Sequence, residues 1–465
     1  MAALELQDIQ GLVARGYRDL RRARFLLLTI GDPVLARRWL AAVAVTRGDE
    51  RPDETAVNLA FTSAGLERLG LDGATLAMFS NEFVAGMTTP HRRRILGDAG
   101  SDAPEEWIWG GPGGPPVHAL LLLYARDAAR LEALEREHAP VGFDVAHRLD
   151  TSDLDDFEPF GFRDGVSQPI VEGLSKTGAP EVTVKAGEFV LGYENEYGLY
   201  TDRPLVDDPS RVLPKDPQGS GRADLGRNGS YLVFRQLRQD VAAFWQFLGG
   251  AAQGDRAAMM RLAAKMVGRW PSGAPLVLAP DADLPALADA NDFAYHEHDR
   301  RGTRCPVGAH IRRTNPRDSL DPAPGPGRSW AINRRHRLLR RGREYGPPLP
   351  REQALAGDDG AERGLHFMCL NANIQRQFEF VQHTWLNNPK FAGLYDDSDP
   401  ITAPSVPNGG TFTIPTDGVR ERMTGVPRFV SVRGGAYFFL PGVAALRYLA
   451  GIGGEPGNSS SPVGS

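Results

Sequence analysis

The chain has 465 residues, of which 41% are hydrophobic, and its 53 basic and 58 acidic side chains leave a net charge of -5. This length predicts two or three domains of about 150 residues each, and the small net charge gives no reason to expect nucleic acid or an anionic membrane as a partner. No run of about 18 apolar residues predicts a membrane span. The two cysteines, Cys305 and Cys369, form neither a disulfide framework nor a zinc knuckle. We therefore expect a cytoplasmic protein that acts on small molecules.

The first 150 residues contain two similar cycles of strand and helix. Apolar runs and alternating stretches predict the strands, and apolar positions at helical spacing predict the helices. Pro33, Thr62 or Ser63, and Asp127 stand where these helices begin. The predicted strands are 23–30, 55–61, 117–124 and 143–149, and the predicted helices are 34–45, 62–69 and 128–138. The order strand, helix, strand, strand, helix, strand is the split βαβ pattern.

The second half repeats this cycle more loosely. Strands are predicted at 230–237, 365–370, 428–432 and 437–440, the last two forming a hairpin around Gly434-Gly435, and helices at 241–248, 375–386 and 443–449. We therefore expect two related α+β domains, residues 1–220 and 221–465. Glycine- and proline-rich connections at 177–187 and 207–229 and an irregular region at 271–304 are long enough to be functional loops. The composition of the tail from about residue 453 predicts disorder.

One stretch of the first half, residues 159–169, places an acid among glycines. Its sequence is Pro-Phe-Gly-Phe-Arg-Asp-Gly-Val-Ser-Gln-Pro, so Asp164 directly precedes Gly165 and follows Gly161 by three residues. Glycine lets the backbone turn sharply and approach a flat ligand closely, which makes Asp164 a candidate functional carboxylate. An Asp-Gly pair alone is more typical of a turn. The acid therefore needs partners elsewhere in the chain.

A second candidate is His310, in the segment Cys-Pro-Val-Gly-Ala-His-Ile-Arg-Arg-Thr-Asn-Pro-Arg of residues 305–317. Imidazole is the usual protein ligand of a peroxidase-type haem iron, and the small residues before it would let a macrocycle lie close. Arginines of this segment are candidates for binding the haem propionates. The alternative is a structural histidine in a basic loop, which the histidine alone does not exclude.

The third candidate lies in a strongly basic segment, residues 334–346. Such runs usually face solvent. Two leucines, Leu338 and Leu339, directly precede Arg340. They predict the end of a strand from which Arg340 can point into a pocket.

Together, the three segments resemble the dye-decolorizing peroxidase family. Gly161-Phe-Arg-Asp-Gly165 resembles its distal acid motif, Ala309-His-Ile-Arg-Arg313 its proximal histidine motif, and Arg340, shortly before Tyr345-Gly346, its distal arginine. The resemblance extends from Asp8-Ile-Gln-Gly11 to Gly434-Gly-Ala-Tyr-Phe-Phe439. It implies two ferredoxin-like domains with antiparallel β-sheets and peripheral helices, and haem b (iron protoporphyrin IX) held mainly by the second domain.

The resemblance also implies roles for single residues. His310 would be the axial metal ligand, Asp164 the distal acid–base group and Arg340 the distal cation. The expected contacts with haem come from Gly165, Val166, Ser167, Arg312, Arg317 and Arg340. Because an unperturbed aspartic acid ionises near ~3.9, Asp164 can act as a base in acid, so we expect an acidic optimum for dye oxidation.

Two further expectations concern the surroundings of the haem. The resemblance places Asn373 where many bacterial members carry an acid that hydrogen-bonds the proximal histidine, with Glu379 or a backbone carbonyl as alternatives. A neutral partner would make the iron easier to reduce. Gly342, where some members have a polar residue, would leave the distal pocket open. The candidate aromatic residues for oxidising large donors are Trp330, Tyr345, Trp385 and Tyr437, although core packing is the commoner role of such residues.

Two functions of different classes follow. The first is a haem peroxidase that reduces hydrogen peroxide and oxidises bulky aromatic donors, such as dyes and phenols, in one-electron steps. The second is a haem-binding protein of low turnover, used in haem storage, sensing or delivery. Expected partners are peroxide and aromatic reductants, with no nucleic acid and no membrane span. The sequence does not decide whether the protein forms a homo-oligomer. Some family members are carried into a nanocompartment shell by a C-terminal peptide, and the tail at residues 457–465 suggests such a peptide only weakly.

Overall fold

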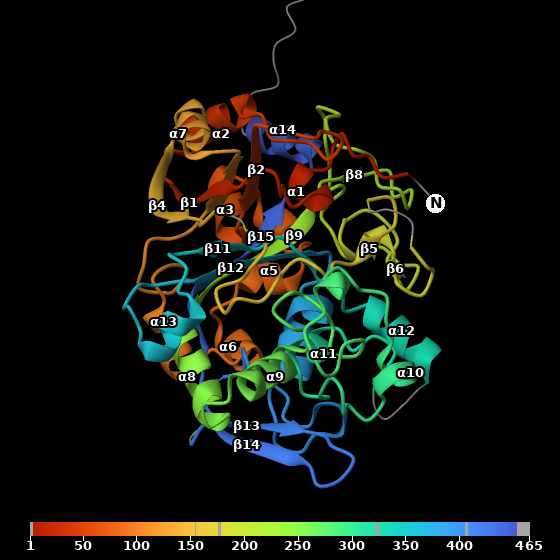
Figure 1. The fold of residues 1–465 in the computed structure, drawn as a ribbon. Coiled ribbons are helices and arrows are strands. Elements are labelled where there is room, and N and C mark those ends of the chain that lie inside the picture. Colours follow the sequence, from red (N-terminus) through yellow and green to blue (C-terminus); the bar gives the residue numbers. More distant parts are fainter. Residues whose placement is uncertain (1–2, 154, 175–177, 321–324, 405–407, 453–465) are drawn as a thin grey trace, which may run out of the picture.

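A nine-stranded antiparallel sheet forms the centre of the fold in the computed structural model, which describes residues 3–153, 155–174, 178–320, 325–404 and 408–452 (Figure 1). Its strands follow the order β10-β12-β9-β15-β2-β3-β1-β4, with β11 also paired to β12. Their bounds are β1 Arg22–Ile30, β2 Thr55–Phe61, β3 Ala119–Ala125, β4 Phe143–Asp150, β9 Ser230–Gln239, β10 Leu339–Arg340, β11 Arg343–Tyr345, β12 Gly364–Asn371 and β15 Val430–Leu440. The expectations for the tail from residue 453 and for the start of the 177–187 connection lie outside the described residues.

The two halves of this sheet have the same strand order. Numbered along the chain within each half, the strands lie in the order 4-1-3-2, as β4-β1-β3-β2 and as β15-β9-β12-β10. This is the order of the split βαβ, ferredoxin-like unit. The halves meet edge to edge where β15 pairs with β2 at Phe439 and Phe61. The predicted α+β class with two ferredoxin-like antiparallel units is therefore confirmed.

Apolar residues cover both faces of β1 and β3. Alternate residues of a strand point to opposite faces, and in β1 the side chains of Leu26 and Leu28 join one core cluster while Phe25 and Leu27 join another. All seven residues of β3 are buried. Burial on both faces explains why these strands are continuous apolar runs in the sequence.

The helices predicted between the strands are present with the expected caps. The carboxylates of Asp32, Asp127 and Asp240 and the hydroxyl of Thr62 accept hydrogen bonds from the first turns of their helices. These helices are α2 Pro33–Ala42, α3 Ser63–Leu69, α7 Ala128–Glu137 and α8 Val241–Ala251, and the C-terminal α14 Val443–Gly451 packs beside α2 (Figure 1).

The hairpin predicted around Gly434-Gly435 is wrong, because β15 continues through both glycines with a register shift between Val432 and Gly434. A Cβ atom on Gly434 would lie 2.5 Å from Nε1 of Trp109. Glycine is therefore needed here so that the buried indole of Trp109 can lie against the strand. The same glycine pair that suggests a turn in the sequence serves close packing in the fold.

Most elements around the C-terminal half were not predicted. They include α6 Pro90–Leu96, α9 Arg256–Val267, α11 His310–Thr314 and the hairpin β13 Gly410–Ile414 with β14 Glu421–Val426, while the predicted 375–386 helix is present as two π-helical pieces, η5 Gln375–Glu379 and η6 Val381–Leu386. In Figure 1, α6, α9 and α11 lie together below the sheet. The remaining short elements are α1 Gly11–Ala14, α4 Gly73–Leu76, α5 Asn81–Ala85, α10 Tyr295–Asp299, α12 Pro326–Arg334, α13 Arg351–Ala356, β5 Ile170–Val171, β6 Thr183–Val184, β7 Leu205–Val206, β8 Ala223–Asp224, η1 Gly100–Asp102, η2 Pro104–Glu106, η3 Ala186–Glu188, η4 Pro285–Leu287 and η7 Phe391–Gly393.

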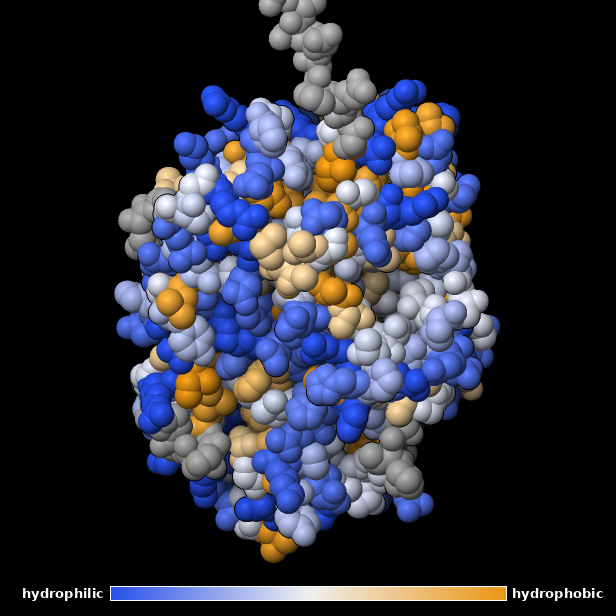
Figure 2. All heavy atoms as spheres, turned by 180° about the vertical axis from the view of Figure 1, so that it is seen from behind, coloured by the Kyte–Doolittle hydropathy of each residue, from blue (hydrophilic) through white to orange (hydrophobic). Residues whose placement is uncertain are grey.

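The surface of the molecule is mixed in character. On the face opposite to that of Figure 1, hydrophobic residues form small groups among hydrophilic ones (Figure 2). Within the part of the chain that the structure describes, no helix is both long and apolar enough to cross a membrane.

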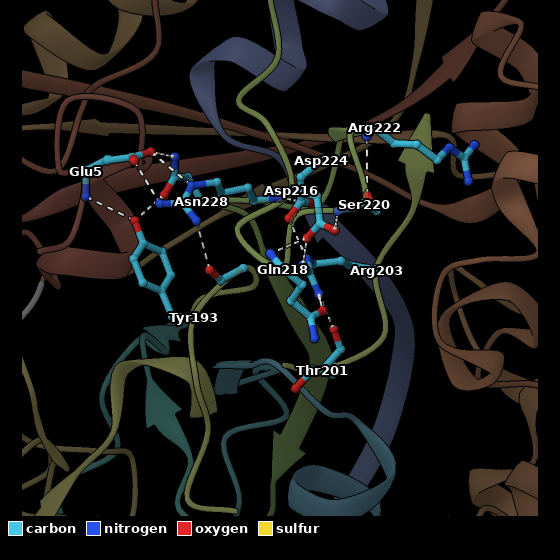
Figure 3. Close-up of polar contacts among 12 residues, drawn as sticks. Glu5, Tyr193, Thr201, Arg203, Asp216, Gln218, Ser220, Arg222, Asp224 and Asn228 are labelled. Atoms are coloured by element: carbon cyan, nitrogen blue, oxygen red, sulfur yellow. Dashed lines mark hydrogen bonds and ion pairs between the residues drawn. The ribbon is translucent and has the colours of Figure 1, made fainter. Parts of the chain in front are cut away.

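A buried ion cluster fixes the long connection between the two halves (Figure 3). The guanidinium of Arg203 binds Asp216 at 2.6 Å and also binds Asp224, and at most 4% of any of these three side chains is exposed. Nearby, the Asn228 amide donates to Glu5 at 2.7 Å and so ties the N-terminal segment to the same region. The connection is therefore held in place by charge, in spite of its glycine- and proline-rich sequence.

Replacing Arg203 with alanine should destabilise the protein by about 3–5 kcal/mol, because it leaves two buried carboxylates without their cation. Urea unfolding of the purified protein measures this change. The matched control is Arg301→Ala, whose ion pair with Asp417 is 72% and 84% exposed and whose loss should cost less than about 1 kcal/mol. Equal effects of the two substitutions would contradict the role given to Arg203.

Candidate active site

A tight hairpin, residues 156–164, carries Asp164; we call it the acid hairpin. Its two arms are joined by hydrogen bonds from Asp164 N to Asp156 O and from Glu158 N to Phe162 O, both 2.9 Å. Gly161 lies in the turn with φ +90°, and Gly165 follows the hairpin with φ +77°, conformations that favour glycine. The glycines around Asp164 thus make a turn, as their sequence suggests, and this turn presents the acid to a cavity.

Arg340 meets Asp164 in this cavity. It is the last residue of β10, and its Nη1 donates to Oδ1 of Asp164 at 2.7 Å across 176 residues of chain. About a third of each side chain, 32% for Arg340 and 33% for Asp164, is open. Burial raises the pKa of Asp164, but the charge and hydrogen bond of Arg340, the Gly165 N–H and the His310 charge together outweigh it and hold that pKa below the usual range of an aspartic acid. Asp164 is therefore an ionised carboxylate at neutral pH.

His310 lines the same cavity from the first turn of α11. Its Nδ1 lies 3.0 Å from Oδ2 of Asp399, whose side chain is fully buried. The other carboxylate oxygen of Asp399 accepts from the N–H groups of Ile401 and Thr402 at 3.0 and 2.8 Å. Burial lowers the pKa of His310 and is the largest single effect. The charge and the hydrogen bond of Asp399, with the charge of Asp164, together raise it by more, so the net shift is upward.

Asp399 corrects the prediction that Asn373, Glu379 or a carbonyl is the partner of His310. The Asn373 side chain accepts from Arg376 N at 2.8 Å. Glu379 binds Arg92 and the hydroxyl of Tyr437. The prediction was wrong because the partner lies 89 residues beyond His310. In the sequence, nothing separates Asp399 from the neighbouring acids Asp396 and Asp397.

The cavity has a water-accessible volume of about 290 Å³ and lies against one face of the C-terminal half of the sheet. Every second residue of adjacent strands faces it, because side chains alternate across a sheet. These residues are Arg235, Leu237 and Gln239 of β9, Leu365 and Phe367 of β12, and Val430 and Val432 of β15. Mainly apolar walls with a few converging polar groups are typical of a cofactor site.

The other predicted haem contacts divide into two groups. Val166 and Ser167 lie in the cavity wall. Arg312 and Arg317 do not, which corrects their prediction as propionate ligands. Arg312 binds Asp299 and the carbonyl of Cys305, and Arg317 binds Asn291 and stacks over Phe293. The charge of Arg312 is paired with buried Asp299, and Arg317, which lines the second cavity, is bound by neutral oxygens of Asn291 and Phe293.

Arg337 is the cation that the sequence analysis missed. It lines both this cavity and a second cavity beside it, together with Asn315. Among the described residues, none forms a hydrogen bond or ion pair with its guanidinium. Burial, together with the charges of Arg317 and Arg340, lowers the pKa of Arg337 to about 9. A cation in this setting is stabilised by an anion, so Arg337 fits an acidic group of a bound cofactor.

The candidate oxidation sites are mostly inside the protein. Tyr345, Trp385 and Tyr437 are 8%, 4% and 2% exposed, and each packs against other aromatic rings. Core packing, the commoner role, fits these three. Trp330 lies in the wall of the second cavity.

This arrangement fits a haem. His310 lines the cavity, its Nδ1 is bound to Asp399, and no group of the described chain hydrogen-bonds to Nε2, which leaves that nitrogen for a metal. A carboxylate behind a metal-ligating histidine is the usual arrangement. Apolar walls suit a macrocycle, and Arg337 suits a propionate.

Comparisons with known proteins give the class to which the chain belongs. No family model matches the chain. The chain is 30% identical to Peroxidase 2 of Mycetinis scorodonius and to a dye-decolorizing peroxidase of Mycena epipterygia, in each case over 96% of this chain and 87% of the relative. It is also 30% identical to a multifunctional dye peroxidase of an Amycolatopsis species, over 96% of both chains.

Solved structures show the same likeness. The crystal structure of a decolorizing peroxidase from Auricularia auricula-judae aligns with a TM-score of 0.79 and 26% identity, over 96% of this chain and 100% of that chain. A dye-decolorizing peroxidase in complex with 2,6-dimethoxyphenol aligns with a TM-score of 0.78 and 27% identity, over 96% and 100%. The fold and these relatives define the class of protein, a haem peroxidase. The chain belongs to the dye-decolorizing peroxidase family.

Replacing Asp399 with asparagine should lower the pKa of His310 in the haem-free protein. The substitution removes the charge that raises this pKa and leaves the burial that lowers it. NMR titration of labelled histidine measures the shift, with His310→Gln to assign the signal. Asn373→Ala is the matched control and should leave the titration of His310 unchanged; the reverse pattern would restore Asn373 as the partner.

Proposed function

We propose that this protein reduces hydrogen peroxide and oxidises bulky aromatic donors, such as dyes and phenols, in one-electron steps. The observation that carries the proposal is the Asp164–Arg340 pair, which shares one cavity with His310. A solved relative binds 2,6-dimethoxyphenol, which supports a phenolic donor. In the balanced reaction, two donor molecules lose one electron each, and peroxide takes up two electrons and two protons to give two water molecules.

We propose haem b as the cofactor, and His310 would hold its iron through Nε2. When bound, haem supplies the iron at which peroxide reacts and the capacity to accept electrons from the donors. Val166 and Ser167 would contact the macrocycle, with Gly165 beside them, and Arg337 would bind a propionate in the place predicted for Arg312 and Arg317.

Asp164 acts as the proton shuttle in this proposal. As an ionised carboxylate it takes a proton from peroxide, and it then returns the proton to the oxygen that leaves as water. Arg340 has two tasks. It keeps Asp164 ionised, and its positive charge stabilises the negative charge that develops as the O–O bond breaks.

Asp399 determines how strongly His310 would donate electrons to a bound metal. A carboxylate that accepts from Nδ1 makes the imidazole more anionic and a stronger ligand than a neutral partner would. This reverses the expectation drawn from Asn373, because a more anionic ligand makes the iron harder to reduce. We therefore propose that the site favours oxidised iron.

Both halves of the fold contribute to the site, and we propose the division between the two domains near residue 220. The acid hairpin then belongs to the first domain, and His310 and Arg340 belong to the second. We also propose that the protein works in the cytoplasm, where its two buried free cysteines, Cys305 and Cys369, would stay reduced.

Haem binding and turnover can be tested separately. Purified protein should show a Soret band and oxidise an anthraquinone dye with peroxide, and His310→Ala should lose the band. Asp164→Asn and Arg340→Leu should keep haem and react with peroxide about 10²–10³-fold more slowly. A protein that binds haem, oxidises no dye and reacts at the same rate in Arg340→Leu would instead be the haem-binding protein of low turnover.

The pH dependence of the peroxide reaction should depend on Arg340. The rate rises as Asp164 loses its proton. Because the pKa of Asp164 is held below the usual range of an aspartic acid, the acid limb of the wild type lies at low pH and the reaction persists in acid. In Arg340→Leu, burial is no longer offset, the pKa of Asp164 rises, and the acid limb should move to higher pH. Stopped-flow rates across pH measure this limb. Asp164→Asn should abolish the limb, and a limb that persists there would assign it to another group.

A further inference from the structure

The acid hairpin is folded around the side chain of Glu158, to which no role has been given so far. Oε1 of Glu158 accepts from Phe162 N at 2.9 Å, and Oε2 accepts from Phe160 N at 3.1 Å. Phe160 and Phe162 are each 3% exposed. Without Glu158, two buried backbone N–H groups of the turn would lack a partner, which is costly.

The same carboxylate attaches the hairpin to the central sheet. Nε2 of Gln239 donates to Oε2 of Glu158 at 2.7 Å. Gln239 is the last residue of β9, and its side chain lines the cavity that Asp164 enters. Glu158 therefore connects the turn of the hairpin to the strand that forms the cavity floor.

Apolar contacts also hold the hairpin against α8. The ring of Phe160 packs on Phe244 with centroids 4.6 Å apart, and the ring of Phe162 is parallel to that of Trp245 at 6.4 Å. Both partners lie on α8. Ring contacts of this kind tolerate sliding, whereas directed hydrogen bonds fix an orientation. Arg163 supplies directed contacts to Pro271 O at 3.1 Å and to Asp289 at 2.8 Å, and Glu158 supplies those that join the turn to the sheet.

The backbone of this segment needs such support. Asp156 has φ +73°, in the left-handed region that non-glycine residues rarely adopt. Burial raises the pKa of Glu158 to about 7, in spite of three hydrogen bonds that lower it and with a further rise from Asp164. A carboxyl kept buried at this cost indicates a specific task.

From this geometry we propose that Glu158 is a positioning residue of the site: its carboxyl group holds the acid hairpin so that Asp164 meets Arg340 in the cavity. The inference rests on the proposed role of Asp164, through which Glu158 acts. It assigns to Glu158 no contact with peroxide or with the donor.

The test compares Glu158→Ala and Glu158→Gln with Asp155→Asn. Asp155 is the matched control because its exposed carboxylate also accepts a backbone N–H, that of Phe157, at 3.1 Å. Hydrogen exchange of the haem-free protein should be at least 10-fold faster over residues 156–164 in Glu158→Ala and less accelerated in Glu158→Gln. Exchange elsewhere, and exchange in Asp155→Asn, should match the wild type.

Kinetics of the haem-loaded protein give the second measurement. In Glu158→Ala the rate constant for peroxide should fall at least 10-fold, while the haem content and the KM for the donor stay at wild-type values. Gln239→Leu keeps Glu158 and removes its attachment to the sheet, so it should change both measurements in the same direction. It also serves as the second variant if Glu158→Ala does not fold.

The outcomes separate this inference from the proposed function. Unchanged exchange over residues 156–164 in both Glu158→Ala and Gln239→Leu, or faster exchange over the whole chain, overturns the positioning role. The positioning role is also overturned if the hairpin exchanges faster in these variants but the rate constant for peroxide is unchanged. If the wild type does not react with peroxide, the proposed function fails, and the exchange experiment still decides whether Glu158 holds the hairpin.

Discussion

The site depends on the ion pair between Asp164 and Arg340. The two residues are 176 positions apart, one on the acid hairpin and one at the end of β10. Each charge would be costly alone in a cavity with mainly apolar walls, and together they are stable. The pair also fixes the protonation state of Asp164, because the guanidinium charge opposes the effect of burial. This one contact therefore fixes both the position of Asp164 in the cavity and its ionised state.

A second carboxylate pair in the same cavity is held in a similar way. His310 is bound to the fully buried Asp399, whose carboxylate is itself held by backbone N–H groups of residues 401 and 402. A histidine with a fixed Nδ1 partner can present only Nε2 to a ligand. In both pairs, therefore, a carboxylate and a cationic or basic group are oriented by the protein itself.

The sequence was most informative where a local pattern determines the structure. Apolar runs and capping residues gave the strands and helices of both sheet halves, and three short motifs gave Asp164, His310 and Arg340, which the structure brings into one cavity. It was least informative about partners that depend on tertiary packing. Asp399 looks like its acidic neighbours, Arg337 looks like any member of a basic run, and Arg312 and Arg317 gave no sign of the buried acceptors that engage them. Gly434 suggested a turn because the indole of Trp109 cannot be seen in a local pattern.

The position of β15 in the sheet bears on how the protein is made. This last strand joins the two halves through Phe439 and supplies Val430 and Val432 to the cavity. A ribosome releases the chain from its N-terminus, and domains generally fold as units in that order. The first half can therefore form its own sheet early, but the join and this part of the cavity wall exist only after residues 430–440 have been synthesised. A cofactor that needs this wall therefore finds a complete site only once β15 is in place.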